Sequence, residues 1–377
     1  MHKFFSFRSK NDFSNDIRNI ISLCGHTKIW FSSDEVDGRA LFNLQHFQTK
    51  MLKWCKSKSN FHYNRFAGPS NESPVREDSI VLLTGGFGNG RLSSSEVFPS
   101  TNNCSLPSLP EPREDHVVFA TAEEDPRVAV CGGSNQNGDK LASCLVLDRK
   151  AQAWDETRVD SLPQPRYSHA AVTLKNIGTY LVGGFLFSDN RRTTDFLPEG
   201  SRQWMSGPSI PVDMNQPCAV VIGKRSFLTI FQFNIREYQV DVNNPTSSNG
   251  WQRATKWPKL LTNRRKGPGC ARIGQRVIIA GGYSSEVERS TEVLNIETRT
   301  IEYAHDLNTP RQFFHIVSIT TEGVERTFAL GGYDFSTYLD SVEELDPETL
   351  IWRESPLNLV ERRDQFGAVE LPKSLAC

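Results

Sequence analysis

Five arginines recur at corresponding places along the chain, and their side chains offer the most evident binding chemistry. Each lies near the start of a segment expected to be the innermost strand of a repeated sheet. Guanidinium groups that converge on one mouth of a central channel can grip carboxylates in a bidentate manner. The alternative is that each arginine forms a salt bridge to a neighbouring sheet or caps loop carbonyls. The predicted binding residues are Arg113, Arg166, Arg264, Arg311 and Arg363.

Three histidines, His116, His169 and His315, also lie near the start of the first strand in three repeats. Three imidazoles are the number of protein ligands that a catalytic zinc ion requires. Repeat symmetry, however, places such positions apart around a ring, and no Asp or Glu recurs with them as a fourth ligand. The sequence therefore predicts that these histidines pack between strands and bind no metal.

The glycine-rich stretch Gly85–Gly90 has the composition of a phosphate-binding loop. It lacks the dinucleotide-binding spacing because position 91 is Arg, and no helical pattern follows it. We therefore predict no nucleotide and no other cofactor.

These residues belong to a repeat that fills most of the chain. Pairs of glycines are separated by 47, 51, 98 and 50 residues, and 98 is twice 49. Each pair follows a short apolar run, which is typical of a buried strand that ends at glycine. In the gap, Phe227–Gln232 keeps the apolar run and loses the glycines, so one repeat is degenerate. The pairs are Gly85-Gly86, Gly132-Gly133, Gly183-Gly184, Gly281-Gly282 and Gly331-Gly332.

An aromatic residue follows the second glycine by 20 or 21 residues in four repeats, and Trp251 has the matching place in the degenerate repeat. An alternating segment lies between the glycines and the aromatic, and a proline-rich turn and a further apolar segment follow. This order predicts four short strands in each period. The four aromatics are Trp154, Trp204, Tyr303 and Trp352.

A period of about 49 residues, with Gly-Gly after the second strand and Trp in the fourth, resembles the kelch repeat. The resemblance covers residues 78–372 and implies an all-β fold, a kelch-type β-propeller with four-stranded blades. The kelch resemblance also implies that the edge of the channel is a common surface for binding partners. Six periods predict six blades.

The two ends of the repeat region complement each other. The first Gly-Gly pair has no apolar strand at the expected distance before it, whereas Arg362–Leu371 has the pattern of a first strand and no repeat of its own. We therefore expect the C-terminal strand to complete the first blade and close the ring, which removes exposed sheet edges. Residues 373–377 are left as a tail.

Residues 1–77 carry no repeat marker and are expected to form a basic, partly disordered appendage, with 12 Lys and Arg against 7 Asp and Glu. One amphipathic helix is expected within 41–54, because its apolar residues have helical spacing. This appendage is shorter than the ligase-adaptor domains that precede many kelch propellers.

The whole chain has a formal net charge of -1, which excludes a general polyanion binder. It contains no run of about 20 apolar residues that could span a membrane. The N-terminus becomes polar before a secretory apolar core forms, which slightly favours an intracellular location over a secreted one.

Cys131 and Cys144 are expected on adjacent strands of one hairpin, within reach of a disulfide bond. Together with Cys104, they resemble the cysteine-bearing repeats of secreted kelch proteins. Glycosylation sequons at Asn71 and Asn103 agree with an extracellular location. Cys218 and Cys270, in contrast, are expected to be buried free thiols, which is the usual state of cysteines on inner strands.

The sequence thus predicts a protein-interaction scaffold without enzymatic activity, whose loops and channel mouth bind another protein, through an acidic segment of that partner. It predicts no binding of nucleic acid. One alternative is an extracellular carbohydrate-binding propeller that uses exposed aromatics, and another is a metal-dependent enzyme on a kelch scaffold. The aromatics that directly follow glycine pairs are Phe87, Phe185, Tyr283 and Tyr333.

Overall fold

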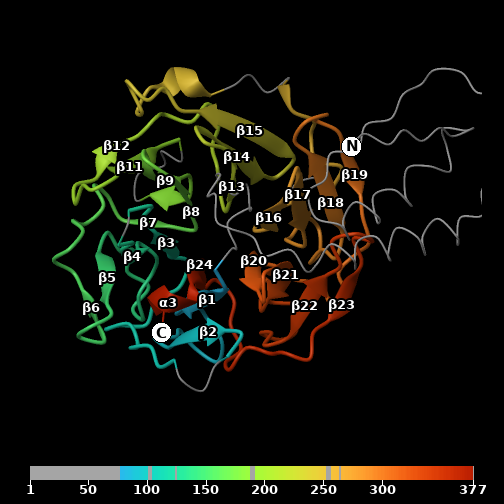
Figure 1. Cartoon of the computed structure of the whole chain (residues 1–377), viewed down its shortest axis with the longest axis horizontal. Coiled ribbons are helices and arrows are strands. Elements are labelled where there is room, and N and C mark those ends of the chain that lie inside the picture. Colours follow the sequence, from blue (N-terminus) through green and yellow to red (C-terminus); the bar gives the residue numbers. More distant parts are fainter. Residues whose placement is uncertain are drawn as a thin grey trace, which may run out of the picture. The chain divides into compact units, whose positions relative to one another are not determined.

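The computed structural model describes residues 77–100, 104–123, 125–186, 192–251, 256–262 and 265–376. In this part of the chain, six antiparallel sheets stand around a central axis as the blades of a propeller (Figure 1). The predicted all-β propeller and its number of blades are confirmed. The predicted appendage with its helix, and the asparagines of both glycosylation sequons, lie outside the described residues.

Each blade is an up-and-down sheet whose first strand lies next to the axis. Blades 1 to 3, from the inner strand outward, contain β24 (Gly367–Pro372), β1 (Ser79–Thr84) and β2 (Ser95–Phe98); β3 (Val117–Ala120), β4 (Val128–Cys131), β5 (Cys144–Asp148) and β6 (Ala153–Asp155); and β8 (Ala170–Leu174), β9 (Gly178–Val182), β11 (Thr194–Pro198) and β12 (Met205–Ser206). A short pair, β7 (Arg166–Tyr167) and β10 (Phe185–Leu186), extends blade 3.

Blades 4 to 6 follow the same order. They contain β13 (Cys218–Gly223), β14 (Ser226–Phe231) and β15 (Asn234–Gln239); β16 (Gly269–Ile273), β17 (Arg276–Ala280), β18 (Thr291–Asn295) and β19 (Ile301–Tyr303); and β20 (His315–Thr321), β21 (Val324–Leu330), β22 (Val342–Leu345) and β23 (Trp352–Glu354). In blade 4 a bridge between Tyr238 and Trp251 stands at the place of the fourth strand. The 3₁₀ helix η1 (Ser248–Gly250) precedes this bridge, and α3 (Lys373–Ala376) ends the described chain.

The C-terminal strand closes the ring, as predicted. β24 pairs with β1 in antiparallel register over six residue pairs, from Ser79 with Pro372 to Thr84 with Gly367. Blade 1 is therefore built from both ends of the propeller sequence. The inner edge of β1 is covered by β24 and is not exposed for pairing with another chain.

The second strand of a blade lies in the middle of the core, which explains its uninterrupted apolar sequence. In blade 5, Val277, Ile278, Ile279 and Ala280 are all fully buried. Both faces of this strand are covered, one by each neighbouring blade, because its side chains belong to two different apolar clusters. A strand buried on both faces reads as a continuous apolar run.

The glycine pairs are explained by the contact between adjacent blades. The Gly133 N–H of blade 2 donates a hydrogen bond of 2.8 Å to the Arg166 carbonyl of blade 3. Its neighbour Gly132 has φ +71°, and a Cβ atom there would lie 2.3 Å from the same carbonyl oxygen. Only glycine combines this backbone angle with so close an approach. The pair thus joins each regular blade to the next one.

The fourth-strand aromatics show two different environments. Trp154 and Trp352 are buried, and their indole N–H groups donate hydrogen bonds to the Pro107 carbonyl and the Thr291 hydroxyl, respectively. Tyr303 at the equivalent place in blade 5 is 58% exposed. The aromatic marker therefore fills space between blades in some repeats and not in all.

Candidate functional site

Four of the five predicted arginines are buried in the structure, with at most 1% of the side chain exposed, and each ends in a similar polar cluster. Arg311 of blade 6 is a representative case. Its guanidinium donates to the Gly331 carbonyl at 2.9 Å, to both oxygens of Ser341, and to Glu343 Oε1 at 3.1 Å. Glu343 is fully buried as well. The cluster holds the first glycine, the third strand and the loop before the inner strand of one blade together.

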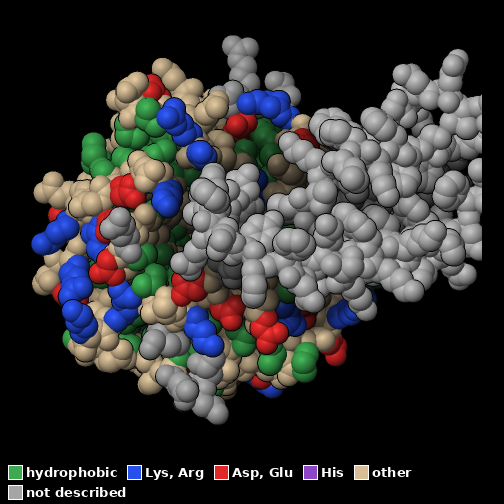
Figure 2. All heavy atoms as spheres, viewed as in Figure 1, with side chains coloured by type: hydrophobic (Ala, Val, Ile, Leu, Met, Phe, Trp, Pro, Cys, Tyr) green, Lys and Arg blue, Asp and Glu red, His purple; other side chains and the backbone are tan. Residues whose placement is uncertain are grey.

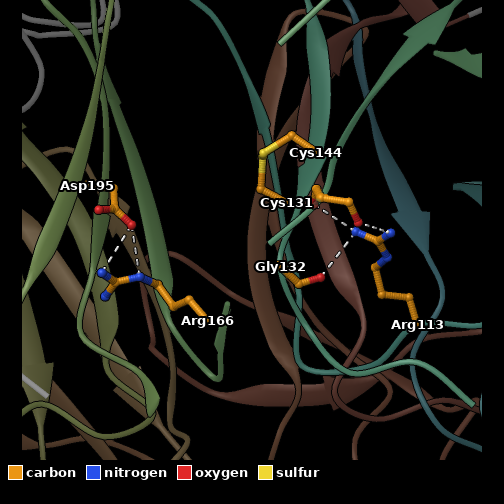
Figure 3. Close-up of a disulfide and its surroundings, with 7 residues drawn as sticks. Arg113, Cys131, Gly132, Cys144, Arg166 and Asp195 are labelled. Carbon is orange, nitrogen blue, oxygen red and sulfur yellow. Dashed lines mark hydrogen bonds and ion pairs between the residues drawn. A yellow bond between two sulfur atoms is a disulfide. The ribbon is translucent and has the colours of Figure 1, made fainter. Parts of the chain in front are cut away.

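The same cluster recurs in other blades with one acidic partner from the third strand. Figure 3 shows the blade 3 member, in which Arg166 points toward Asp195. The shortest guanidinium-to-carboxylate distances are 3.1 Å for Arg166–Asp195, 2.8 Å for Arg265–Glu292, 3.1 Å for Arg311–Glu343 and 2.9 Å for Arg363–Glu96. Paired and hydrogen-bonded guanidinium groups can be buried in this way, whereas unpaired ones cannot.

Blade 2 has the cluster without a buried carboxylate. Arg113 donates to the Gly132 carbonyl at 3.2 Å and to the Ser143 hydroxyl at 2.9 Å, as Figure 3 shows in part. Leu145 occupies the place of the acidic residue on the third strand, and the charge partner is the more exposed Glu111 at 3.4 Å.

These positions refine the arginine prediction. Arg264 lies outside the described residues, and the buried arginine of blade 5 is its neighbour Arg265. The observed contacts agree with the alternative prediction, in which the arginines form salt bridges and cap loop carbonyls. Each arginine–carboxylate pair, however, lies within one blade and does not link two blades. A role for these arginines in binding a partner stays a prediction, and their burial does not favour it.

Blade 4 lacks the arginine, and the apolar Met214 takes its place. The Met214 carbonyl accepts the N–H of Gly184 at 2.8 Å, as the arginine carbonyls accept the second glycine in other blades. Its side chain is fully buried in an apolar cluster. The acidic residue of the third strand, Glu237, is nevertheless retained. Lys256 at 2.9 Å and the indole N–H of Trp257 at 3.0 Å stabilise its carboxylate instead.

Aromatic side chains fill the junction between blades 3 and 4. The ring of Tyr180 lies 4.5 Å from Phe196, 5.5 Å from Phe227 and 5.7 Å from Tyr238, between ring centroids. Both tyrosine hydroxyls donate to the carbonyl of Pro245. We call these residues, together with Trp251, the aromatic cluster. It supplies large apolar area and ring contacts at the junction where Met214 replaces the buried arginine.

The structure contains a disulfide bond between Cys131 and Cys144, the pair singled out from the sequence. The two residues face each other on β4 and β5, with Cα atoms 4.2 Å apart. A second disulfide joins Cys218 to Cys270, with Cα atoms 6.1 Å apart. The prediction that these two are free thiols is therefore wrong. They lie on the inner strands of the neighbouring blades 4 and 5, and the sequence could not show that their two side chains face each other.

Six residues, one from each blade, form a ring at one end of the channel, with φ between 50° and 56°. Their backbones are linked to one another, for example by the Ser168 N–H to the Asp115 carbonyl at 2.9 Å and the Asp115 N–H to the Gln365 carbonyl at 2.8 Å. Left-handed geometry at non-glycine residues costs about 1–3 kcal/mol each, so the surrounding blades must impose it. We call this end of the propeller the ring face. The ring consists of Asp115, Ser168, Gln216, Gly267, Phe313 and Gln365.

The channel behind the ring contains a cavity of about 270 Å³, which the inner strands line. His116 and His169 border it, but their imidazoles pack under the glycines of the preceding blade. Phe314 and Phe366 fill the same places in blades 6 and 1. Burial, followed by the charge of the nearby arginine, holds the pKa of both histidines well below the usual value. These two imidazoles thus occupy packing positions.

His315 stands one residue later than the other two histidines relative to the buried arginine, on strand β20. One ring nitrogen hydrogen-bonds to the Phe366 carbonyl at 2.8 Å. Within the described residues, no three His, Cys, Asp or Glu side chains are arranged to hold a metal ion.

Outside the ring, short bridges place three side chains of a blade in a row on the ring face. In blade 1, Phe87 pairs with Arg91 on one side and with Asp364 on the other. Directly paired residues of antiparallel segments present their side chains on the same side. The equivalent rows are Lys140–Ser134–Glu114 in blade 2, Val287–Tyr283–Lys266 in blade 5 and Tyr338–Tyr333–Gln312 in blade 6.

Three of the four aromatics that follow glycine pairs, Phe87, Tyr283 and Tyr333, are the central members of these rows, and Phe185 pairs with Tyr167 between β10 and β7. Tyr283 and Phe87 are half-buried, and Phe185 stacks on Tyr167 with centroids 4.9 Å apart. In blade 6, Tyr333 lies 5.0 Å from Tyr338 and 6.4 Å from Phe335, which is 71% exposed. Among these aromatic side chains, Phe335 of blade 6 is the most exposed.

Three carboxylates gather where blades 1 and 2 meet on the ring face. Burial, followed by the charges of Asp115 and Glu114, raises the pKa of Asp364 to about 8. Burial, with the charge of Glu114 as a smaller cause, raises the pKa of Asp115 to about 6. Sequence reasoning missed this group. The signal was available as acidic residues one and two positions after Arg113 and one after Arg363, but the sequence does not show that these side chains face one another where blades 1 and 2 meet.

Charges on the outer part of the propeller are mixed. On the face seen in Figure 2, Lys and Arg side chains lie beside Asp and Glu side chains over the visible blades.

The described part of the chain contains no helix with the length and apolar composition that a membrane span requires.

In a comparison with protein families, residues 325–356 match the model of the kelch motif. This segment contains most of β21, both glycines of blade 6, β22 and Trp352. Comparison with curated proteins finds no match.

Proposed function

Because the chain is a kelch-type six-bladed β-propeller, we propose that it is a protein-interaction scaffold that binds its partner on the ring face. Propellers of this type commonly serve protein interaction and generally have no enzymatic activity. The proposal therefore assigns no reaction to the ring face.

The observation that carries the proposal is the contrast between the rows on the ring face and the clusters behind them. The buried arginine, the glycine carbonyl and the Ser or Thr directly before the third strand repeat in five blades. The rows in front differ from blade to blade in charge and size, from Lys140–Ser134–Glu114 to Tyr338–Tyr333–Gln312. A constant scaffold that presents varied side chains is the arrangement that binding surfaces on repeat proteins use.

Site-specific photo-crosslinking tests this proposal. Benzoylphenylalanine replaces Phe335 on the ring face in the full-length protein, and it replaces Tyr303 on the outermost strand of blade 5 in a matched control. Both side chains are aromatic and exposed, at 71% and 58%, so neither replacement disturbs the core. The variants are irradiated in extract of the cells that express the protein.

We expect adducts of defined mass from position 335 and none from position 303. Adducts from position 303 alone would place the partner on the outermost strands of the blades and contradict binding on the ring face. An absence of adducts from both positions would contradict the scaffold function.

A further inference from the structure

The three carboxylates at the junction of blades 1 and 2 form a compact group on the ring face. The Asp115 N–H donates to the Gln365 carbonyl at 2.8 Å, which sets the segments 114–115 and 364–365 side by side. Glu114, Asp115 and Asp364 therefore meet although Asp364 lies 249 positions after Asp115 in the sequence. We call this group, together with the rings described below, the acidic pocket.

The positive charges around the acidic pocket leave one carboxylate unpaired. Arg91 forms an ion pair with Glu114 at 2.8 Å. Lys140 donates to the Ser134 hydroxyl at 2.8 Å and lies 4.0 Å from the centre of the Tyr167 ring. Asp364 is 4% exposed, and in the described part of the chain its Oδ1 atom has no hydrogen-bond partner. A buried carboxylate oxygen without a donor is costly, and a ligand that donates to it removes this cost.

Aromatic rings stand beside this carboxylate. Phe87 is the direct bridge partner of Asp364, so the two side chains lie on the same side of the backbone. The Phe87 ring is 5.4 Å from the ring of Tyr338, which in turn is 5.0 Å from Tyr333. Burial, followed by the charge of Asp364, raises the pKa of Tyr338. The phenol and the carboxylate are thus close neighbours.

We propose that the acidic pocket binds one positively charged side chain, an arginine or lysine in a basic segment of the partner protein. A cation supplies the donor that Asp364 Oδ1 lacks, and the faces of Phe87 and Tyr338 stabilise it by cation–π interaction. When Asp364 is ionised, the three carboxylates exceed Arg91 and Lys140 by one negative charge, which the cation neutralises. Because burial raises the pKa of Asp364 to about 8 in the free protein, binding of the cation is coupled to release of the proton from this carboxyl group. This inference rests on the proposed function, and it gives the partner the opposite charge to the acidic segment predicted from the arginines.

Selection from a random peptide library on the full-length protein tests the proposal. Peptides are enriched on the wild type and counter-selected on Asp364→Asn, which keeps the size of the side chain. The strongest peptide is then synthesised with its arginine replaced by citrulline, or its lysine by norleucine. Asp115→Asn serves as a second variant, because Asn adopts left-handed backbone angles readily. Glu302→Gln on the exposed outermost strand of blade 5 is the matched control.

We expect the enriched peptides to share one basic residue. Its neutral replacement should weaken binding to the wild type and to Glu302→Gln at least about tenfold, as one charge-assisted hydrogen bond predicts. The same replacement should change binding to Asp364→Asn less than about threefold. Peptides that bind the ring face without a shared basic residue would overturn the acidic pocket and leave the scaffold function intact. A library without any enriched peptide would count against both.

Discussion

Blade 6 and blade 4 solve the same structural problem with different chemistry. Blade 6 ties its loop, its glycine turn and its third strand together through Arg311 and Glu343, both without measurable exposure. Blade 4 has Met214 instead and no glycine pair, and it is held by the aromatic cluster on one side and by the Cys218–Cys270 disulfide on the other. The comparison shows that a blade position tolerates loss of the repeat markers when apolar contacts and a covalent bond replace the polar cluster.

The largest effect is expected when blade 6 receives the residue of blade 4. Arg311→Met leaves the buried carboxylate of Glu343 with hydrogen bonds from Asn308 and Thr309 but without a positive charge beside it, so the free energy of unfolding should fall by about 3–5 kcal/mol. Arg113→Met in blade 2 is the matched control, because no buried carboxylate faces Arg113 and the loss should be smaller, about 1–3 kcal/mol. Urea denaturation of both variants measures the difference. Equal losses would mean that the ion pair adds nothing to the carbonyl contacts.

A second test removes the covalent bond of blade 4. Replacement of Cys218 and Cys270 by Ser should lower the free energy of unfolding by about 4 kcal/mol, as the chain-entropy model gives for a closed loop of this size. The bridge spans 52 residues, against 13 for Cys131–Cys144, so the equivalent double substitution in blade 2 should cost less, about 3 kcal/mol. Thermal denaturation without reductant measures both. A larger loss in blade 2 would contradict the special dependence of blade 4 on its disulfide.

The aromatic cluster contributes hydrogen bonds as well as apolar area. Tyr238→Phe removes the hydroxyl that donates to the carbonyls of Pro245 and Ser247, at 3.0 and 2.7 Å. The free energy of unfolding should fall by about 1 kcal/mol. Tyr180→Phe, which removes a single donor to Pro245 and leaves the Tyr238 donor in place, should cost less. If neither variant differs from the wild type in urea denaturation, ring packing alone supports this junction.

The smallest expected effect on stability comes from one packing position, which His169 fills in blade 3 and Phe314 fills in blade 6. His169 stays neutral in the folded protein because its pKa is held well below the usual value, mainly by burial. The unfolded chain takes up a proton below about pH 6.5, so this histidine makes the fold less stable as the pH falls from there. His169→Phe copies Phe314 and should reduce the loss of stability between pH 7.5 and 5.5 by about 1 kcal/mol.

His116→Phe is the control for this substitution, because one nitrogen of His116 hydrogen-bonds to the Thr84 hydroxyl at 2.9 Å. That variant should lose stability at pH 7.5, whereas His169→Phe should not, since neither ring nitrogen of His169 has a partner within the described structure. An identical pH profile of His169→Phe and the wild type would show that this ring takes up a proton in the folded state.

The sequence by itself determined the repeat, and with it the blades, because the glycine pairs meet a local requirement. Their positive φ angles and close contacts at the blade junctions leave no alternative residue, so the period is visible in one chain. The closing strand was predictable for a related reason. Residues 362–371 match the first strand that the first repeat lacks. This complementarity can be recognised from the sequence pattern alone, without knowing how close the two ends lie in space.

Only the tertiary structure decided what the polar residues do. Cys218 and Cys270 form a bond because two inner strands converge at the channel, and Arg311 turns into its own blade because Glu343 lies there. The acidic pocket joins residues from both ends of the propeller sequence. Whether Asp364 Oδ1 receives a hydrogen bond depends on which side chains the fold places beside it. Spacing along the chain identifies a repeated position, but the direction of a side chain and its partners depend on atoms that are distant in sequence and are brought close when the ring closes.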